Sequence, residues 1–396
     1  MEPRIRDRAV RLGTASVWAG ETESGDGRAT VSPIARGVTH AFDDLEAWTE
    51  VATGARPGHI YARNTNPTLA VFEDKVRVLE GAEDATSFAT GMAAISNTLF
   101  ALLSPGDRVV SIKDTYGGTH KIFTDFLPRF GIEVALCETT DHDALETALE
   151  AGARVLYLES PTNPTLKVLD LRRLARAGRA AGATVVVDNT FATPINQRPL
   201  ELGADLVLHT ATKYLGGHSD ALGGVVCGAA ELVRRLFRFR EITGATLDPD
   251  AAFLLTRGMR TLELRVERQS ASALRIAEFL ADHAAVEEVF YPGLPSDPGH
   301  EIARGQMTGF GGMLSFSLAG GLEAVRRFLP RLELAHRAAS LGSVGTLVGP
   351  PSTTSHVELT MEERAAAGIP EGLVRYSVGI ENVEDLIADL GRVLAT

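Results

Sequence analysis

The sequence predicts an α/β protein with a mostly parallel sheet covered by helices on both faces, followed by a smaller α+β domain. Between Asp84 and Gly244, short apolar segments alternate with helical segments, a pattern typical of strand–helix–strand units with right-handed crossovers. After Gly244, strands and helices follow one another in a different order. A chain of 396 residues has room for two or three domains of roughly 100–200 residues each.

The first 62 residues predict an extended arm. They are rich in Gly, Thr, Ser and Asp, and residues 20–27 have the composition of a loop. An arm of this length that packs on nothing of its own chain is expected to pack on a partner subunit. We therefore expect an arm over 1–62, a large α/β domain over 63–255 and a C-terminal α+β domain over 256–396.

The first regular element is a helix that begins after Asn66. Asn66 is a suitable N-cap, Pro67 suits the first helical position and Gly81 suits the C-cap. The large domain continues with a helix that opens at Thr90 and ends before Ser104, strands at 108–112, 155–158, 184–187 and 206–208, and helices at 141–150 and 171–181.

The C-terminal part begins with a long helical stretch over 250–284. Residues 312–318 alternate between apolar and polar side chains, which is typical of a half-buried strand. A helix at 323–329, a strand at 375–380 and a closing helix capped by Asn382 complete this part.

Composition narrows the function. The net charge of −12 argues against nucleic acid or an anionic membrane as the main partner. Cys137 and Cys227 both lie among apolar residues, so we expect free buried thiols in a reducing compartment and no metal site. The N-terminus has no apolar signal segment, and no stretch approaches the roughly 18 apolar residues of a membrane helix. We expect a cytoplasmic protein.

Polar side chains gather where the predicted parallel strands end. In an open α/β sheet, ligands bind beyond the carboxyl ends of the strands. The residues that fall at or just past such ends are Asn163, Asp188, Thr210, Thr212 and Lys213.

Lys213 follows the buried strand at 206–208. Burial lowers the pKa of a lysine and makes its amine nucleophilic, as a Schiff-base lysine requires; a lysine that only marks a strand end is the alternative. Asp188 follows three valines, and a buried carboxylate needs a partner, although an Asp that accepts hydrogen bonds in a turn is also common. One strand–helix–strand unit apart, the pair could hold the two ends of a pyridoxal phosphate ring.

A phosphate would need its own anchor. Gly91 and Met92 open a helix, whose free N–H groups and dipole favour an anion. Thr210 and Thr212 supply hydroxyls, and Arg63 supplies a charge-assisted hydrogen bond. The chain contains neither Gly-x-Gly-x-x-Gly nor a P-loop, which counts against a nucleotide.

Taken together, these motifs resemble the pyridoxal-phosphate enzymes of cysteine and methionine metabolism, which include cystathionine γ-synthase, cystathionine γ-lyase, methionine γ-lyase and the O-acyl-homoserine sulfhydrylases. The resemblance covers nearly the whole chain and is closest to methionine γ-lyase. It rests on Tyr61-x-Arg63-x-x-Asn66-Pro67-Thr68, Gly91-Met92, Tyr116-Gly117-Gly118-Thr119, Glu159-Ser160-Pro161-x-Asn163-Pro164, Asp188-Asn189-Thr190, the stretch from Thr210 to Asp220, Ser340-Leu341-Gly342 and Arg375-x-Ser377-Val378-Gly379.

The resemblance implies the aspartate-aminotransferase-like fold (fold type I), with a seven-stranded sheet, and pyridoxal 5'-phosphate as cofactor. It implies that Lys213 is the Schiff-base lysine and proton shuttle and that Asp188 pairs with the pyridine nitrogen. Asn163 would touch the phenolic oxygen of the cofactor. Tyr116 would stack on the ring, contact the substrate and serve as general acid or base at the γ-leaving group.

The remaining roles follow from the same resemblance. Gly91, Met92, Thr210 and Thr212 would hold the phosphate, and Tyr61 and Arg63 would complete the site of the neighbouring subunit in a homotetramer built as a dimer of dimers. Tyr61 would also contact the substrate. Arg375 would bind the substrate carboxylate with help from the backbone near Ser340; without the resemblance, an exposed cation at a strand start is the default interpretation of Arg375.

The implied reaction is γ-elimination on an L-amino acid with a leaving group at Cγ, which gives a 2-oxo acid and ammonia through a vinylglycine-type intermediate. A γ-replacement transferase is the alternative. A third hypothesis is an inactive family member that acts as a binding protein, and the intact Lys213, Asp188 and Tyr116 speak against it.

Several positions depart from the pattern of the family. Ile60, Ala339 and Gly345 stand where relatives that act on cystathionine carry acidic residues, so a distal ammonium group would lack counter-charges. Gly118 stands where methionine γ-lyases carry a cysteine, and Thr210 stands where many relatives carry serine. The segment Gly349-Pro350-Pro351 is unusual and is expected to reshape the substrate pocket.

Overall fold

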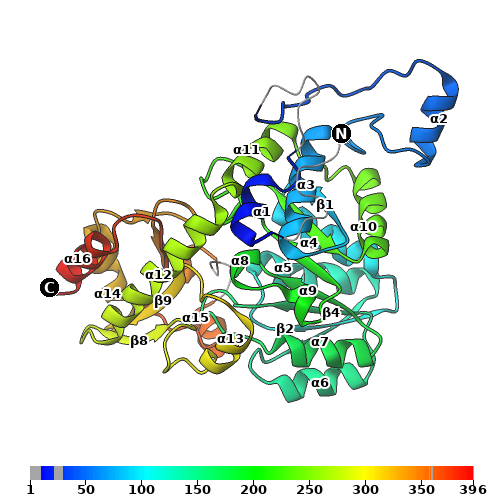
Figure 1. The fold of residues 1–396 in the computed structure, drawn as a ribbon. Helices are drawn as coiled ribbons and strands as arrows, with labels where there is room; N and C mark the ends of the chain where they lie inside the picture. The colour runs from blue at the N-terminus through cyan, green and yellow to red at the C-terminus, as the bar shows by residue number, and fades with distance from the viewer. Residues whose placement is uncertain (1–9, 22–29, 356, 358–359, 396) are drawn as a thin grey trace.

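The computed structural model describes residues 10–21, 30–355, 357 and 360–395, and two sheets organise this part of the chain (Figure 1). The larger sheet has seven strands in the order β1-β7-β6-β5-β4-β2-β3; β7 pairs antiparallel with both of its neighbours, β1 and β6, and the other pairs are parallel. This mostly parallel sheet confirms the predicted fold class. Its strands are β1 (Asp84–Phe88), β2 (Arg108–Ile112), β3 (Glu133–Cys137), β4 (Val155–Glu159), β5 (Thr184–Asp188), β6 (Leu206–His209) and β7 (Gly224–Gly228).

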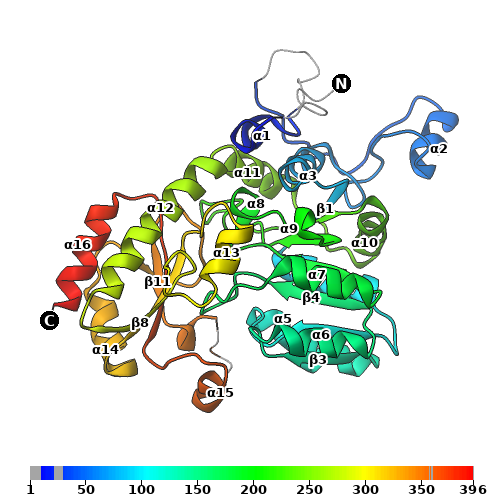
Figure 2. The same ribbon diagram turned by 60° about the horizontal axis from the view of Figure 1, so that its bottom comes forward.

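Helices cover both faces of this sheet, because its strands carry apolar side chains on both sides. One face packs Leu206 and Leu208 against α4 and α10, and the other packs Val185 and Val187 against α6 and α7 (Figure 2). The helices are α3 (Pro67–Glu80), α4 (Gly91–Leu102), α6 (His142–Glu150), α7 (Leu171–Ala180) and α10 (Ala230–Thr243).

The caps predicted for α3 are confirmed. The Asn66 side chain accepts a hydrogen bond from the backbone N–H of Thr68, Pro67 occupies the first turn, and Gly81 adopts the left-handed conformation. Shorter helices lie in the connections between these elements and in the C-terminal part of the chain. They are α5 (Gly117–Lys121), a π-helix at Ile122–Phe126, a 3-10 helix at Leu127–Phe130, α8 (Thr193–Asn196), α9 (Pro199–Leu202), α13 (His300–Gln306) and α15 (Met361–Ala366).

The second sheet has five strands in the order β10-β11-β12-β9-β8 and forms the C-terminal part of the chain. Its own core lies between the sheet and three helices. The strands are β8 (Val286–Phe290), β9 (Met313–Leu318), β10 (His336–Arg337), β11 (Leu347–Gly349) and β12 (Leu373–Ser377), and the helices are α12 (Leu262–Ala281), α14 (Gly321–Phe328) and α16 (Val383–Leu394), with 3-10 turns at Leu329–Arg331 and Pro351–Thr353.

The prediction of a half-buried strand at 312–318 is wrong, because β9 is buried along its whole length. Leu314 and Phe316 pack into the core of the second sheet. On the opposite side, the Ser315 hydroxyl donates to the carbonyl of Pro164, 2.7 Å away. The polar side of this strand therefore faces the large domain and not water.

The single helical stretch predicted over 250–284 is two helices, α11 (Pro249–Met259) and α12. Just before the break, Gly258 lies against the backbone of Gly216, where a Cβ would come within 2.0 Å of the Gly216 carbonyl oxygen. The Arg265 guanidinium then donates to the carbonyls of Gly258 and Tyr214 at 2.9 and 2.8 Å. Along α12, Val266 packs with residues of α3 and α11, and Ala273 packs in the core of the second sheet.

The arm is only in part what the sequence suggested. Helix α1 (Leu12–Trp18) packs on its own chain, with Ala15 in the core that α3 shares. Below it, the buried Lys75 amine donates to the carbonyl of Ser16 at 2.9 Å. An arm without contacts to its own chain is therefore a wrong prediction for residues 10–21, whereas α2 (Leu45–Thr53) has no buried residue and lies away from the sheets (Figures 1 and 2). Residues 1–9 and 22–27 of the predicted N-terminus and loop lie outside the described residues.

Both cysteines carry free thiols. Cys227 is buried as predicted, but Cys137 is only half-buried, because β3 is the last strand of its sheet. No helix of the described part of the chain has both the length and the apolar character needed to cross a membrane.

Candidate active site

A cavity of about 270 Å³ lies beyond the carboxyl ends of β4, β5 and β6. The N-terminus of α4 closes one end of the cavity. The second sheet contributes another wall, formed by β12 and by the segment before β11. Ten residues predicted from the sequence line it together: Gly91, Met92, Tyr116, Asn163, Asp188, Thr210, Thr212, Lys213, Ser340 and Arg375. The parallel strands thus bring residues far apart in the chain to one edge, as the sequence predicts.

Lys213 lies just past β6, and its amine donates to the Ser340 hydroxyl at 2.9 Å. Burial, and then the charge of Arg375, lower the pKa of Lys213 from 10.5 to about 8. Ser340 has φ +108°, a backbone conformation that non-glycine residues rarely adopt. This strained residue holds both of its oxygens near the two cations.

Arg375 lies inside β12 and is only 7% exposed, so the default interpretation of an exposed strand-start cation is wrong. Its guanidinium donates to Asn163 Oδ1 at 3.0 Å and to the Ser340 carbonyl at 3.1 Å. Burial lowers the pKa of Arg375 to about 10. Among the described residues no carboxylate forms an ion pair with it, so a ligand carboxylate would supply the missing counter-charge.

Asp188 ends β5 and is buried. Thr190 donates to Asp188 Oδ1 from its backbone N–H at 3.0 Å and from its hydroxyl at 2.5 Å. Burial raises the pKa of Asp188, and the hydrogen bonds from Thr190 oppose that rise because they stabilise the ionised form.

Glu159 is a site residue whose role the sequence analysis missed, although a carboxyl group at the end of a buried strand was a signal. It ends β4 directly opposite Asp188 in the sheet register and lines the cavity. Burial, and then the charge of Asp188, raise the pKa of Glu159 well above its ordinary value. Burial thus raises the pKa of both neighbouring carboxyl groups, and the hydrogen bonds from Thr190 oppose the rise at Asp188.

The N-terminus of α4 forms the other end of the cavity. A Cβ on Gly91 would lie 2.0 Å from Thr210 Oγ1, so only glycine lets the helix start approach this hydroxyl. Thr90 caps the helix through the backbone N–H of Ala93. Thr212 faces the same region, with its hydroxyl hydrogen-bonded to the backbone of Gly223.

Three residues expected near the cofactor lie at the rim or outside. Tyr116 lines the cavity but is 44% exposed, and its backbone N–H donates to Glu159 Oε2 at 2.8 Å. Tyr61 and Arg63 do not line the cavity of their own chain. Instead, the Arg63 guanidinium lies over the Tyr61 ring and donates to the carbonyl of Glu241.

Comparison with known proteins identifies the family. A model of the family described as Cys/Met metabolism PLP-dependent enzyme matches residues 13–395. An L-methionine gamma-lyase of Fusobacterium nucleatum subsp. polymorphum is 45% identical over 96% of both chains, and a cystathionine gamma-lyase of Bacillus subtilis is 44% identical over 88% of this chain and 92% of its own. A solved cystathionine gamma synthase of Xanthomonas oryzae pv. oryzae, in complex with aminoacrylate and cysteine, superposes with a TM-score of 0.92 at 40% identity and covers 98% of both chains. The chain belongs to this family, and its cofactor is pyridoxal phosphate.

The cavity fits that cofactor. A buried amine of lowered pKa suits the aldehyde, and the buried Asp188 carboxylate suits the pyridine nitrogen. The start of α4, opened by Gly91 against the Thr210 hydroxyl, suits the phosphate.

The lowered pKa of Lys213 gives a testable pH dependence. Only the neutral amine attacks an aldehyde, and a depressed pKa makes the amine neutral at lower pH. The rate at which the cofactor-free protein combines with pyridoxal phosphate should therefore rise with pH and show an inflection near pH 8. Stopped-flow absorbance measures this rate. Arg375→Leu should move the inflection upward, because the nearby positive charge is lost.

Arg326→Leu, at an exposed arginine paired with Glu323, is the matched control and should leave the inflection in place. An inflection near 10.5, the ordinary value for lysine, would contradict the assignment, as would an Arg375→Leu profile equal to that of the control.

Proposed function

We propose that this member of the Cys/Met metabolism PLP-dependent enzyme family catalyses elimination at Cγ of an L-amino acid and releases a 2-oxo acid and ammonia. The observation that carries the proposal is the Lys213 amine, which has a pKa lowered to about 8 and lies in one cavity with Asp188 and with the Arg375 guanidinium, which has no ion-pair partner among the described residues. Relatives named as γ-lyases, 45% and 44% identical, support it.

Lys213 is the proposed proton carrier. Bound pyridoxal phosphate supplies an aldehyde that condenses with amines and a ring that withdraws electrons from the substrate Cα. With cofactor and substrate bound, the Lys213 amine would take the Cα proton and deliver it further along the substrate. The Ser340 hydroxyl, 2.9 Å from Nζ, would orient the amine during this proton transfer.

Arg375 is proposed to bind the substrate, and Asp188 is proposed to bind the cofactor ring. The fork of the Arg375 guanidinium matches a carboxylate, so the substrate α-carboxylate would replace the present contacts to Asn163 and to the Ser340 carbonyl. Asp188 would keep the pyridine nitrogen protonated. Glu159 lies beside Asp188, and its raised pKa favours the neutral form, which would not compete with Asp188 for that positive charge.

Tyr116 is the proposed acid for the leaving group. Its side chain stands at the mouth of the cavity, while its backbone is anchored to Glu159 Oε2. A phenol in this place can donate a proton to the group that leaves Cγ.

A γ-replacement transferase is the second candidate function. A second cavity beside the active site favours it. A larger cavity of about 1070 Å³ adjoins the first and shares Thr212, Leu222, Ala339 and Ser340 with it. Small residues, Ala339 and Gly345, line this side. A second reactant, such as a thiol, could approach Cγ from there.

A substrate screen separates these functions. We expect the cofactor-loaded protein to release 2-oxo acid and ammonia from L-methionine or from an O-acyl-homoserine, measured by coupled dehydrogenase assays. Cystathionine should be a poor substrate, because Ile60, Ala339 and Gly345 offer no charge to its distal ammonium. Lys213→Ala should reduce turnover by roughly 10²–10⁴-fold.

Adding a thiol to the assay distinguishes γ-elimination from γ-replacement. If thioether formation from O-acyl-homoserine exceeds 2-oxo acid release, the γ-replacement candidate replaces the lyase. If no compound turns over although the cofactor is bound, the protein is a non-catalytic member of its family.

We further propose a homotetramer, a dimer of dimers, in which Tyr61 and Arg63 complete the neighbouring site. Their position outside the cavity of their own chain supports this, and so does the apolar surface of the arm. Leu45 is 76% exposed and Trp48 is 50% exposed, and burial of such side chains between subunits would stabilise the assembly. The free thiols of Cys137 and Cys227 support a cytoplasmic location.

Complementation tests the shared site. Lys213→Ala and Arg63→Ala should each be nearly inactive, but mixed dimers formed from the two contain one complete site, so mixing after dissociation should restore activity. A mixture of Lys213→Ala and Asp188→Asn is the matched control, because both residues belong to one chain's site and each mixed dimer remains incomplete. Equal recovery in both mixtures, or none in the first, would contradict the shared site.

A further inference from the structure

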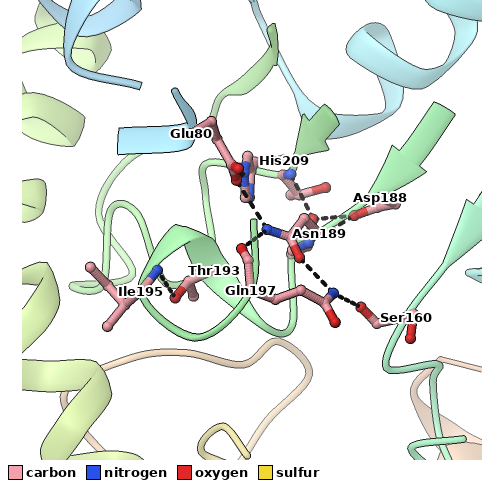
Figure 3. Close-up of polar contacts among 10 residues, drawn as sticks. Glu80, Ser160, Asp188, Asn189, Thr193, Ile195, Gln197 and His209 are labelled. Carbon is pink, nitrogen blue, oxygen red and sulfur yellow. Dashed lines mark hydrogen bonds and ion pairs between the residues drawn. The ribbon is translucent and has the colours of Figure 1, made fainter. Parts of the chain in front are cut away.

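Behind Asp188, on the side of the sheet away from the cavity, lies a buried polar cluster that the mechanism does not use (Figure 3). Glu80, the last residue of α3, is its centre. Glu80 Oε1 lies 2.6 Å from His209 Nε2 and accepts a hydrogen bond from Asn189 Nδ2 at 3.0 Å. The Glu80 side chain is completely buried and that of His209 is 1% exposed.

The two partners of Glu80 are the sequence neighbours of two site residues. Asn189 follows Asp188 past the end of β5, and His209 precedes Thr210 at the end of β6. Successive residues of an extended chain point to opposite faces. Accordingly, Asp188 and Thr210 line the cavity, whereas Asn189 and His209 point toward Glu80 (Figure 3).

The strand ends are also tied on the cavity side. The Thr190 hydroxyl accepts from the backbone N–H of Thr210 at 2.9 Å and donates to Asp188 Oδ1. On the far side, the Gln197 side chain donates to Asn189 Oδ1 and to the carbonyl of Ser160, both at 3.0 Å (Figure 3). The ends of β4, β5 and β6 are thus connected behind the cavity.

We propose that Glu80 and His209 form a hydrogen-bonded lock that positions Asp188 and Thr210, and with them the pyridine and phosphate ends of the cofactor. A buried carboxyl group is costly unless it is hydrogen-bonded, and His209 Nε2 and Asn189 Nδ2 both lie within hydrogen-bond distance of Glu80 Oε1. One carboxylate oxygen fixes two adjacent strand ends, so loss of the pair would let them shift relative to each other. The proposal rests on the roles proposed above for Asp188 and Thr210.

The pair does not touch the cavity, so both members are positioning residues. Neither Glu80 nor His209 lines the site. Their effect on the cofactor must therefore pass through the backbone at Asn189 and Thr210. A purely structural pair would contribute only to the stability of the fold, and the two roles differ in what they predict for the bound cofactor.

Glu80→Gln and His209→Gln test the lock, because each replaces one partner of the Glu80–His209 hydrogen bond with a neutral amide of similar size. We expect each variant to bind pyridoxal phosphate at least about tenfold more weakly, measured by titration of the cofactor-free protein. At saturating cofactor, the visible circular dichroism of the bound ring should change, since that signal depends on ring orientation. The double variant should lose little more affinity than either single variant, because both break one interaction.

Asp389→Asn is the matched control. Asp389 is a buried carboxylate in the second core that accepts from the backbone of Glu333 and Leu334, so its loss should lower the melting temperature without a change in cofactor affinity or dichroism. If Glu80→Gln and His209→Gln behave like Asp389→Asn, or if their effects on affinity multiply in the double variant, the lock is refuted. If Glu80→Gln fails to fold, the visible circular dichroism of the cofactor bound to His209→Gln tests the lock by itself. Cofactor binding by the unmodified protein would stand in either case, so this failure is separate from failure of the proposed function.

Discussion

The confinement of two cations, Lys213 and Arg375, in one cavity is the constraint on which the rest of the site depends. Arg375 is 7% exposed, and no carboxylate among the described residues pairs with it. Burial, and then the charge of the arginine, make the lysine give up its proton more readily. The arginine itself, without an ion-pair partner among the described residues, makes its part of the cavity receptive to a carboxylate. The charge of Arg375 therefore contributes both to the reactivity of the amine and to affinity for a carboxylate.

Two sheets are needed to build this arrangement. The parallel strands of the large sheet bring Asp188, Thr210 and Lys213 to one edge, while β12 of the second sheet carries Arg375 across to them. Ser340 joins the two sides, because its hydroxyl accepts from the lysine and its carbonyl accepts from the arginine. The strained backbone at this serine is a cost that the surrounding contacts offset.

Sequence reasoning succeeded where local rules determine the structure. The caps of α3, and the gathering of Asp188, Thr210 and Lys213 at adjacent strand ends, follow from turn chemistry and from parallel-strand geometry. It failed where distant contacts decide. The burial of Arg375, the packing of α1 and the full burial of β9 all depend on segments more than 50 residues away. Glu159 was overlooked because its raised pKa depends on its burial in the folded protein and then on the charge of Asp188 on the neighbouring strand.

Borohydride reduction of the cofactor-loaded protein, followed by peptide mass mapping, tests most directly whether the Lys213 amine holds pyridoxal phosphate. Reduction fixes the cofactor to the amine that carries it, so the added mass should lie on the peptide that contains Lys213 and on no other. The equally depressed but inaccessible Lys75 amine provides an internal control, because it has the pKa without the cavity. Label on Lys75 or another lysine, or a protein that binds the cofactor and yields no labelled peptide, would contradict the account.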